Sequence, residues 1–181
     1  MKALSKRIAF LLLLVITAGY LLPLRVSPPV AYAGIQKIDR ESFWYYPWGD
    51  TGVHKGIDLF CDRGTGVRAP AAGIVIRKGY GSVSGHYLYV LGAQWRTYYF
   101  AHLDTIFVDR GQYVSRETPL GTAGNSGNAA GKPTHLHFSI ETLLPYPSRY
   151  DGRDIEGWKK MFYLDPVAEL HLDPATHPFL R

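Results

Sequence analysis

The stretch H-L-H-F-S-I, residues 135–140, decides the fold class, because its apolar and polar side chains alternate strictly. Successive side chains of a β-strand point to opposite faces, so Leu136, Phe138 and Ile140 share one face and the polar residues share the other. This pattern predicts a strand with one face in the core and one open face. The segment 121–131, just before it, holds four glycines together with Asn and Ser residues and predicts a loop.

Short apolar runs punctuated by glycine continue over much of the chain. Runs of about four to eight residues at such spacing are typical of antiparallel strands. The composition agrees, since 13 Tyr and 19 Gly favour strands joined by turns over long helices. The sequence therefore predicts an all-β fold of mainly antiparallel sheets. The strands expected outside the opening stretch are 73–76, 86–91, 97–101, 113–114 and 120–121.

Two short motifs are candidates for metal chemistry. His135 and His137 occupy positions i and i+2 of the predicted strand, which share a face about 7 Å apart. Two imidazoles on an open face beside a glycine-rich loop have no packing reason to be there. The second motif is H-K-G-I-D at 54–58. Its His and Asp would lie about 13 Å apart in an extended strand, too far to share one zinc ion, but Gly56 allows a bend that brings them together.

Together these motifs can supply two imidazoles and one carboxylate. Three protein ligands with one open position are typical of catalytic zinc, whereas structural zinc is closed by four ligands. Each motif also has an ordinary interpretation: H-x-H alone is a weak signal, and 54–58 alone is compatible with a loop that holds a hydrogen-bonded His and Asp. Cys61 follows Asp58 by three residues and is a further candidate ligand, although a lone cysteine is usually a small buried hydrophobic residue.

The first 33 residues contain four basic residues and no acidic one, and they carry most of the net charge of +5. A basic start precedes an apolar run over 8–22, which is shorter than a comfortable membrane span of roughly 18–20 residues. The sequence A-Y-A at 31–33 is a possible cleavage signal, although 23–30 makes a long gap before it. The segment 1–33 is predicted to be a signal peptide or an uncleaved membrane anchor with a Pro-rich linker, rather than a buried core helix, and both predict export.

The remainder of the chain is nearly neutral. Of the 20 basic residues, 16 lie in 34–181, against 15 acidic ones, and they form no dense basic stripe, so no nucleic-acid partner is expected. The length suits one compact domain without internal repeats. The aromatic-rich stretch 43–49 predicts a cleft wall or a packed edge. Residues 145–157 predict a surface loop, and 158–164 and 167–170 predict short helical or strand caps.

Several motifs occur together in the order and spacing of one family. They are H-K-G-I-D at 54–58, G-T-G-V at 64–67 with Ala69 and Gly73, Y-F-A-H-L at 99–103, G-N-S-G at 124–127, H-L-H-F at 135–138 and a closing L-D-P at 164–166. With them, the region 50–141 resembles the lysostaphin-type (LytM-like) peptidoglycan zinc metallopeptidases. Several motifs in the right order are far more specific than any one of them.

The resemblance implies an antiparallel β architecture that forms a groove, with one zinc ion per chain bound by His54, Asp58 and His137. It also implies that His102 and His135 bind no metal and act on the attacking water and the developing oxyanion, without fixing which does which. The substrates it implies are the peptide stems or bridges of peptidoglycan. The chain is therefore expected to be a zinc metalloendopeptidase of the cell envelope or periplasm, with possible anchoring in the inner membrane by its N-terminal segment.

The chain departs from the family pattern in three places. Ser139 replaces the usual acid after H-L-H-F, and Glu141 follows two positions later; neither is an expected ligand. The loop 143–161 is longer than the common core and is a candidate groove wall. No asparagine occurs in 34–54, so an inhibitory segment that plugs the metal through an asparagine is not expected.

Two functions from different classes compete. The first is an active endopeptidase, and the second is a non-catalytic envelope scaffold that activates another wall hydrolase after losing its own ligands. All five candidate positions are filled here, which favours the enzyme. A third candidate function is a carrier or phosphotransfer domain with the same β architecture. Such a domain would not need Asp58 next to His54, so this function is not favoured.

The expected organisation is a leader or anchor over 1–33 and a metallopeptidase domain over 34–181, with a motif core at about 50–141 and a closing segment at 162–170. The histidines that match no motif are expected to be ordinary surface or loop residues; they are His86, His171 and His177.

Overall fold

The computed structural model of the chain describes residues 2–172, without the side chains of residues 2–5 and 50. The described strands are β1 (Lys37–Ile38), β2 (Ile57–Phe60), β3 (Gly66–Arg68), β4 (Gly73–Gly81), β5 (Gly85–Gly92), β6 (Arg96–Ile106), β7 (Tyr113–Val114), β8 (Pro119–Ala123), β9 (His135–Thr142) and β10 (Tyr163–Leu164). The α-helices are α1 (Lys2–Leu21) and α2 (Pro166–Glu169), and the 3-10 turns are η1 (Tyr32–Gly34), η2 (Arg40–Ser42), η3 (Gly49–Thr51), η4 (Ala93–Trp95), η5 (Gly127–Ala129), η6 (Pro147–Arg149) and η7 (Lys159–Phe162).

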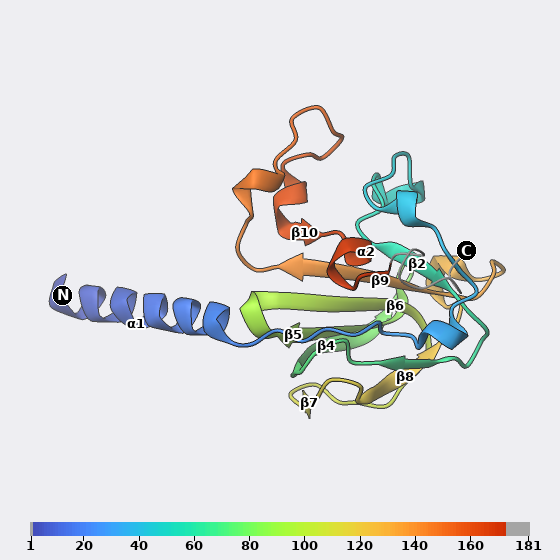
Figure 1. Cartoon of the computed structure of the whole chain (residues 1–181), viewed down its shortest axis with the longest axis horizontal. Helices are drawn as coiled ribbons and strands as arrows, with labels where there is room; N and C mark the ends of the chain where they lie inside the picture. The colour runs from blue at the N-terminus through green and yellow to red at the C-terminus, as the bar shows by residue number, and fades with distance from the viewer. Residues whose placement is uncertain (1, 173–181) are drawn as a thin grey trace.

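The strands form one antiparallel sheet, with the order β1-β2-β9-β6-β5-β4-β7 and with β10 paired to β9 (Figure 1). Strand β8 pairs with both β3 and β6. The central strand β9 lies between β2 and β6, and in its register His137 is opposite Asp58 on one side and Ala101 on the other. The mainly antiparallel β fold predicted from the sequence is confirmed, and the register already brings two candidate metal ligands together.

The alternating pattern of β9 divides its side chains between two environments, as predicted. Leu136, Phe138 and Ile140 are completely buried in the core, where Tyr98 and Phe100 of β6 pack with them. His135, His137, Ser139 and Glu141 lie on the opposite face and line a cavity. The sheet therefore separates a hydrophobic core from a polar, accessible floor.

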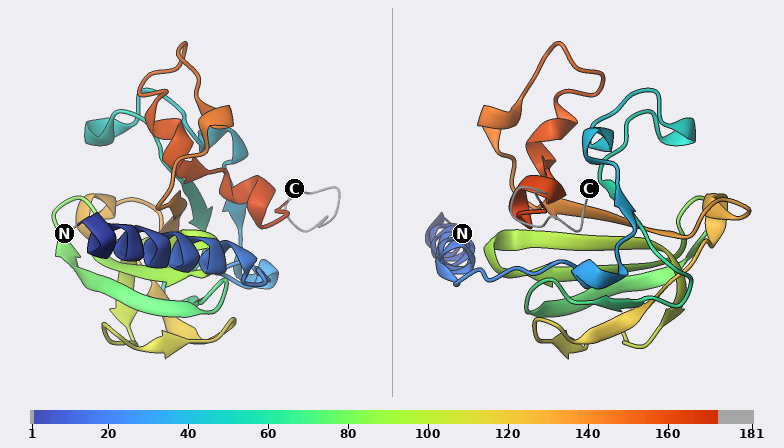
Figure 2. Two further views of the ribbon diagram at one scale, coloured as in Figure 1. Left: turned by 90° about the vertical axis from the view of Figure 1, so that its left-hand side faces the viewer. Right: turned by 45° about the vertical axis from the view of Figure 1, so that its right-hand side comes forward.

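Helix α1 lies beyond one end of the sheet in Figure 1 and in the right-hand view of Figure 2. Its apolar side chains, such as Phe10 and Leu13, are exposed. It contacts the turn η4 between β5 and β6, where Trp95 Nε1 donates a hydrogen bond to the Ile16 carbonyl at 2.9 Å. Of the helices described here, none is both long and apolar enough to cross a membrane.

Residues 26–36, whose consecutive prolines at 28 and 29 predict a linker, are packed along the sheet. Val30 and Ile35 are buried in the core, and the Arg68 amide donates to the Pro29 carbonyl at 2.8 Å. The segment is held there because its apolar side chains are buried in the core. The prolines predict a linker, but they do not predict this burial.

Two irregular loops stand on the same side of the sheet, one with η2 and η3 and the other with η6 and η7 (Figure 2). They contact each other directly. Trp44 Nε1 donates to the Ile155 carbonyl at 3.0 Å, and Lys55 Nζ pairs with Glu156 Oε2 at 2.7 Å. The loop 143–161 was a candidate groove wall, but none of its described residues lines the cavity; it braces the wall formed by the first loop.

Candidate metal centre and active site

The cluster of His54, Asp58 and His137 is assembled by two neighbouring strands and the loop that enters one of them. Asp58 on β2 and His137 on β9 are register partners, whereas His54 lies in the loop just before β2. Gly56 permits this approach, because a Cβ there would lie 2.3 Å from the Phe138 carbonyl oxygen. The glycine expected to allow a bend therefore serves another purpose as well: it lets the chain pass closely over β9.

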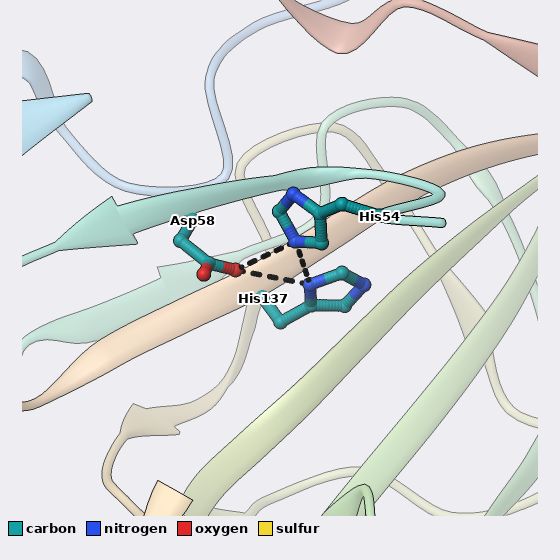
Figure 3. Close-up of side chains that lie close together, drawn as sticks. All are labelled: His54, Asp58 and His137. Atoms are coloured by element: carbon teal, nitrogen blue, oxygen red, sulfur yellow. Dashed lines mark hydrogen bonds and ion pairs between the residues drawn. The ribbon is translucent and has the colours of Figure 1, made fainter. Parts of the chain in front are cut away.

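The donor atoms of these three residues converge on one point (Figure 3). His54 Nε2 lies 3.2 Å from Asp58 Oδ1 and 3.0 Å from His137 Nδ1, and His137 Nδ1 lies 3.0 Å from Asp58 Oδ1. All three side chains are buried or nearly so, with His54 only 1% exposed. The sequence motifs that lie 83 residues apart thus meet in one compact site.

Backbone carbonyls fix the orientation of three histidines in the site. A carbonyl oxygen only accepts hydrogen bonds, so the ring Nδ1 that contacts it must donate, and in the neutral imidazole Nε2 then keeps its lone pair. The carbonyls are those of Ser42 for His54 at 3.0 Å, Ser126 for His102 at 2.9 Å and Pro133 for His135 at 2.9 Å. Such outer contacts are typical of histidines that bind metal or transfer protons.

The protonation of the cluster favours metal binding. Burial disfavours the charged form of Asp58, but hydrogen bonds with His137 and His54 outweigh it and hold the pKa of the carboxyl well below its usual range. Burial lowers the pKa of the His137 imidazole. A carboxylate beside the neutral His137 imidazole is the ligand form that metals require.

The donor set fits zinc in both type and spacing. Zinc bonds of about 2.0–2.1 Å in a tetrahedron place ligand atoms roughly 3.3 Å apart. The observed separations of 3.0–3.2 Å are close to that value. With Nδ1 donating to the Ser42 carbonyl, His54 Nε2 faces Asp58 Oδ1 and His137 Nδ1, so these three atoms are placed to share one cation. With three protein donors, a fourth tetrahedral position remains for water or substrate.

His102 enters the site through an irregularity in β6. The strand continues past it to Ile106, but His102 has a positive φ of 61°, and the register with β5 shifts between His86 and Leu88. This bulge breaks the alternation, so both Ala101 and His102 line the cavity. Bulges often redirect a side chain next to active sites, and a non-glycine residue at positive φ stores strain there. The strand was expected to end at this point.

His135 lies on the cavity side of β9, two residues before His137. Its Nε2 is 3.9 Å from Asp58 Oδ2, and its ring centroid is 4.9 Å from that of His102. The structure therefore brings together all five candidate residues, with three donor atoms in mutual contact and two further imidazoles beside them.

The cavity has a volume of about 660 Å³ and runs along the open face of the sheet. This volume is in the range typical of ligand sites. Trp48 closes one side, where its ring stacks on His54 with centroids 4.0 Å apart. The aromatic stretch 43–49 predicts a cleft wall or a packed edge, and Trp48 lines the cavity; no sequence signal indicates that Trp48 stacks on a candidate ligand.

The other candidates lie outside the cluster. Cys61 is buried in the hydrophobic core and is not part of the metal-binding group. His86 and His171 are exposed, as expected for surface histidines. His177 lies outside the described residues. Glu141, which was expected to have no ligand role, does line the cavity.

Comparisons with known proteins place the chain in a family. The model described as Peptidase family M23 matches residues 52–151, more than half of the chain. The Peptidoglycan DD-endopeptidase ShyC of Vibrio cholerae is 26% identical over 99 residues, which are 55% of this chain and 23% of that protein. The L-Ala–D-Glu endopeptidase of Bacillus subtilis is 31% identical over 106 residues, which are 51% of this chain and 32% of that protein.

A solved structure described as a zinc containing peptidase from Vibrio cholerae has a similar fold. Its TM-score is 0.54 at 27% identity, and the match covers 65% of this chain and 36% of that one. The chain thus spans about a quarter to a third of the length of the two curated relatives. The resemblance predicted from the order of the motifs is confirmed, and the chain belongs to peptidase family M23.

Proposed function

We propose that this chain is a zinc-dependent endopeptidase that hydrolyses peptide bonds in the stems or crosslinks of bacterial peptidoglycan. One observation carries the proposal: His54 Nε2, Asp58 Oδ1 and His137 Nδ1 converge within 3.0–3.2 Å in a cavity that also holds two further histidines. Three donors with a remaining open position are the ligand arrangement of zinc hydrolases.

His54, Asp58 and His137 would hold one zinc ion per chain. When bound, zinc supplies Lewis-acid polarisation of a carbonyl and acidifies a water molecule. The chain contributes the fixed geometry, because the Ser42 carbonyl and the Trp48 ring hold His54 on two sides. The pairing of β2 with β9 holds Asp58 against His137.

His102 and His135 would handle protons during hydrolysis. Burial, followed by the neighbouring His137, lowers the pKa of His102 to about 4, so its imidazole is neutral at pH 7. With Nδ1 engaged by the Ser126 carbonyl, Nε2 can accept a proton from the attacking water and return it to the leaving amine. His135, beside both Asp58 and His102, is the second group that can hold a proton near the developing negative charge.

The substrate class is supported by the relatives. One is named a peptidoglycan DD-endopeptidase and the other an L-Ala–D-Glu endopeptidase, and these names specify different peptide bonds. Membership in this family therefore supports hydrolysis of wall peptides without selecting the bond. An open cavity lined by polar and aromatic groups suits an extended peptide.

The competing function is a non-catalytic scaffold that activates another wall hydrolase. All five candidate residues are present, and backbone carbonyls orient His102 and His135. A non-catalytic scaffold needs neither three converging donor atoms nor two oriented histidines, so the site favours the enzyme.

We also propose that the chain acts outside the cytoplasm, where peptidoglycan lies, with 1–33 as a leader or anchor and 34–181 as the peptidase domain. A reporter that folds only after export, fused after Arg181, should be active. Reporter activity confined to the cytoplasm would contradict this assignment.

The direct test of the proposed function is digestion of purified peptidoglycan by the zinc-loaded chain, followed by mass analysis of the released fragments. New amino and carboxyl ends at one peptide bond, lost on chelation and restored by zinc, are the expected result. Undigested wall, with activation of a separate hydrolase by the same preparation, would support the scaffold instead.

A further inference from the structure

Beyond the candidate metal centre, the cavity floor continues along β9 to Glu141. Residues at every second position of a strand share a face, so Ser139 and Glu141 extend the row begun by His135 and His137. All four line the same cavity. Glu141 lies four positions after His137 on the strand, which corresponds to roughly 13 Å between their Cα atoms.

Aromatic side chains surround Glu141 on the neighbouring strands. Tyr163 of β10 is its register partner, and Tyr99 of β6 is the partner of Ser139. Tyr89 of β5 packs against Tyr99 with ring centroids 4.5 Å apart. Burial, and then the charge of Glu141, raises the pKa of both Tyr89 and Tyr163, which places these phenols within the field of the carboxylate.

No cationic side chain neutralises Glu141 among the side chains that the structure describes. None of their Lys, Arg or His nitrogens lies within ion-pair distance of it, and its hydrogen-bond partner is the Ser139 hydroxyl. Lys55 and Lys132 also line the cavity. Lys55 is paired with Glu156 and with the Thr51 carbonyl, and Lys132 forms no ion pair with Glu141 among the described side chains. Burial raises the pKa of Glu141 to about 7, because the carboxylate is partly removed from water without a counter-charge.

An acidic group in this setting is suited to a cation that arrives with the substrate. A partly buried carboxylate without a counter-charge is unfavourable, so an incoming ammonium group gains a charge-assisted hydrogen bond. The faces of tyrosine rings also attract ammonium groups. The tyrosines around Glu141 therefore favour the same ligand as its charge.

We propose that Glu141, with Tyr163 and Tyr99, forms a subsite that binds a primary ammonium group on the peptide substrate and so determines which peptides are cleaved. This inference rests on the proposed endopeptidase function and adds a specificity determinant to it. Two residues of extended peptide span roughly 7 Å. A long amino-bearing side chain, such as that of a diamino acid, placed about two residues from the scissile bond would reach Glu141 from the candidate metal centre.

The test compares three synthetic stem peptides on the full chain. The first carries a diamino acid with a free side-chain amine, the second is acetylated at that amine, and the third has norleucine there, which keeps the bulk without the charge. Binding is measured by calorimetry on metal-free protein, and hydrolysis is measured by mass spectrometry after zinc loading. The variants are Glu141→Gln and the control Glu117→Gln, which removes an exposed carboxylate on the turn between β7 and β8.

The unmutated chain and Glu117→Gln should prefer the free amine over both uncharged peptides by about 10- to 100-fold in affinity or kcat/KM, the range for a hydrogen bond to a charged group. Glu141→Gln should lose most of this preference while keeping the same circular dichroism spectrum. The inference would be overturned if the unmutated chain bound and cleaved all three peptides equally well. It would also be overturned if Glu141→Gln kept the preference for the free amine.

The binding measurement separates this inference from the proposed function. If the unmutated chain cleaves no peptide but binds the amine selectively through Glu141, the proposed function fails and the subsite stands. If it cleaves wall peptides without regard to the amine, the function stands and the subsite is wrong.

Discussion

Replacing Glu141 with Gln should change how the stability of the protein depends on pH. Burial raises the pKa of this carboxyl from its ordinary value of 4.5 to about 7 in the folded protein. Between these two values the folded state binds more protons than the unfolded state. The free energy of unfolding therefore falls as the pH rises through this window.

The size of the effect follows from the pKa difference. Each unit is worth about 1.36 kcal/mol, so the full loss as the pH rises from below 4.5 to above 7 is at most about 3–4 kcal/mol. Water in the cavity reduces this figure, because Glu141 is only partly buried. Glutamine keeps the shape and cannot ionise, so Glu141→Gln should match the unmutated chain near pH 4.5 and be more stable by about 1–3 kcal/mol at pH 8.

The assay is urea unfolding of the metal-free full chain at several values of pH between 4.5 and 8.5, followed by circular dichroism. At each pH the free energy of unfolding of the unmutated chain is subtracted from that of Glu141→Gln. This difference removes the contribution of the other groups, which titrate in both proteins. Glu117→Gln is the control and should show no gain in this window, because Glu117 is exposed and its pKa is lowered by partners such as Ser27 and Arg68. A difference between Glu141→Gln and the unmutated chain that stays constant with pH would refute the reasoning.

Two further predictions concern the framework of the metal centre. Gly56→Ala should lower the melting temperature by at least about 5 °C, because its Cβ would lie 2.3 Å from the Phe138 carbonyl oxygen, whereas Gly66→Ala has open space and should change it little. Equal melting temperatures for these two variants would contradict the close approach of β2 to β9. Trp48→Ala removes the ring stacked on His54 and should weaken zinc binding by about tenfold in a competition titration; unchanged affinity would mean that the stack does not position the ligand.

Much of the fold could be predicted from the sequence, because its main strand has a strictly local signal. The alternation of apolar and polar residues in 135–140 depends only on strand geometry, and the structure places Leu136, Phe138 and Ile140 in the core as that geometry requires. Register could not be obtained in this way. The pairing of β2 with β9, which places Asp58 beside His137, joins segments 79 residues apart and depends on the packing of the whole sheet.

The parts of the site that the sequence did not reveal depend on backbone conformation and on side chains distant in the sequence. His102 enters the cavity through a bulge, which no periodicity predicts. The orientation of the imidazoles depends on backbone carbonyls, which every residue carries, so residue types give no sign of it. The position of Glu141 is a partial exception: its spacing of four from His137 already placed both on one face, but its lack of a counter-ion appears only in the structure.

The central claim is that His54, Asp58 and His137 bind zinc, whereas His102 and His135 act on the reaction. Its most direct test is to measure zinc content and the rate of peptidoglycan hydrolysis on the same purified variants. The alanine variants to compare are those of His54, His137, His102, His135 and the exposed control His86.

The account predicts that His54→Ala and His137→Ala lose zinc and activity together, because each removes one of three protein donors. His102→Ala and His135→Ala should keep nearly one zinc per chain and lose about 10²–10⁴-fold in rate, the usual contribution of a positioned acid–base group. His86→Ala should change neither property. Loss of zinc from His135→Ala with retention by His137→Ala would contradict the ligand assignment, and an unchanged hydrolysis rate in His102→Ala would contradict its catalytic role.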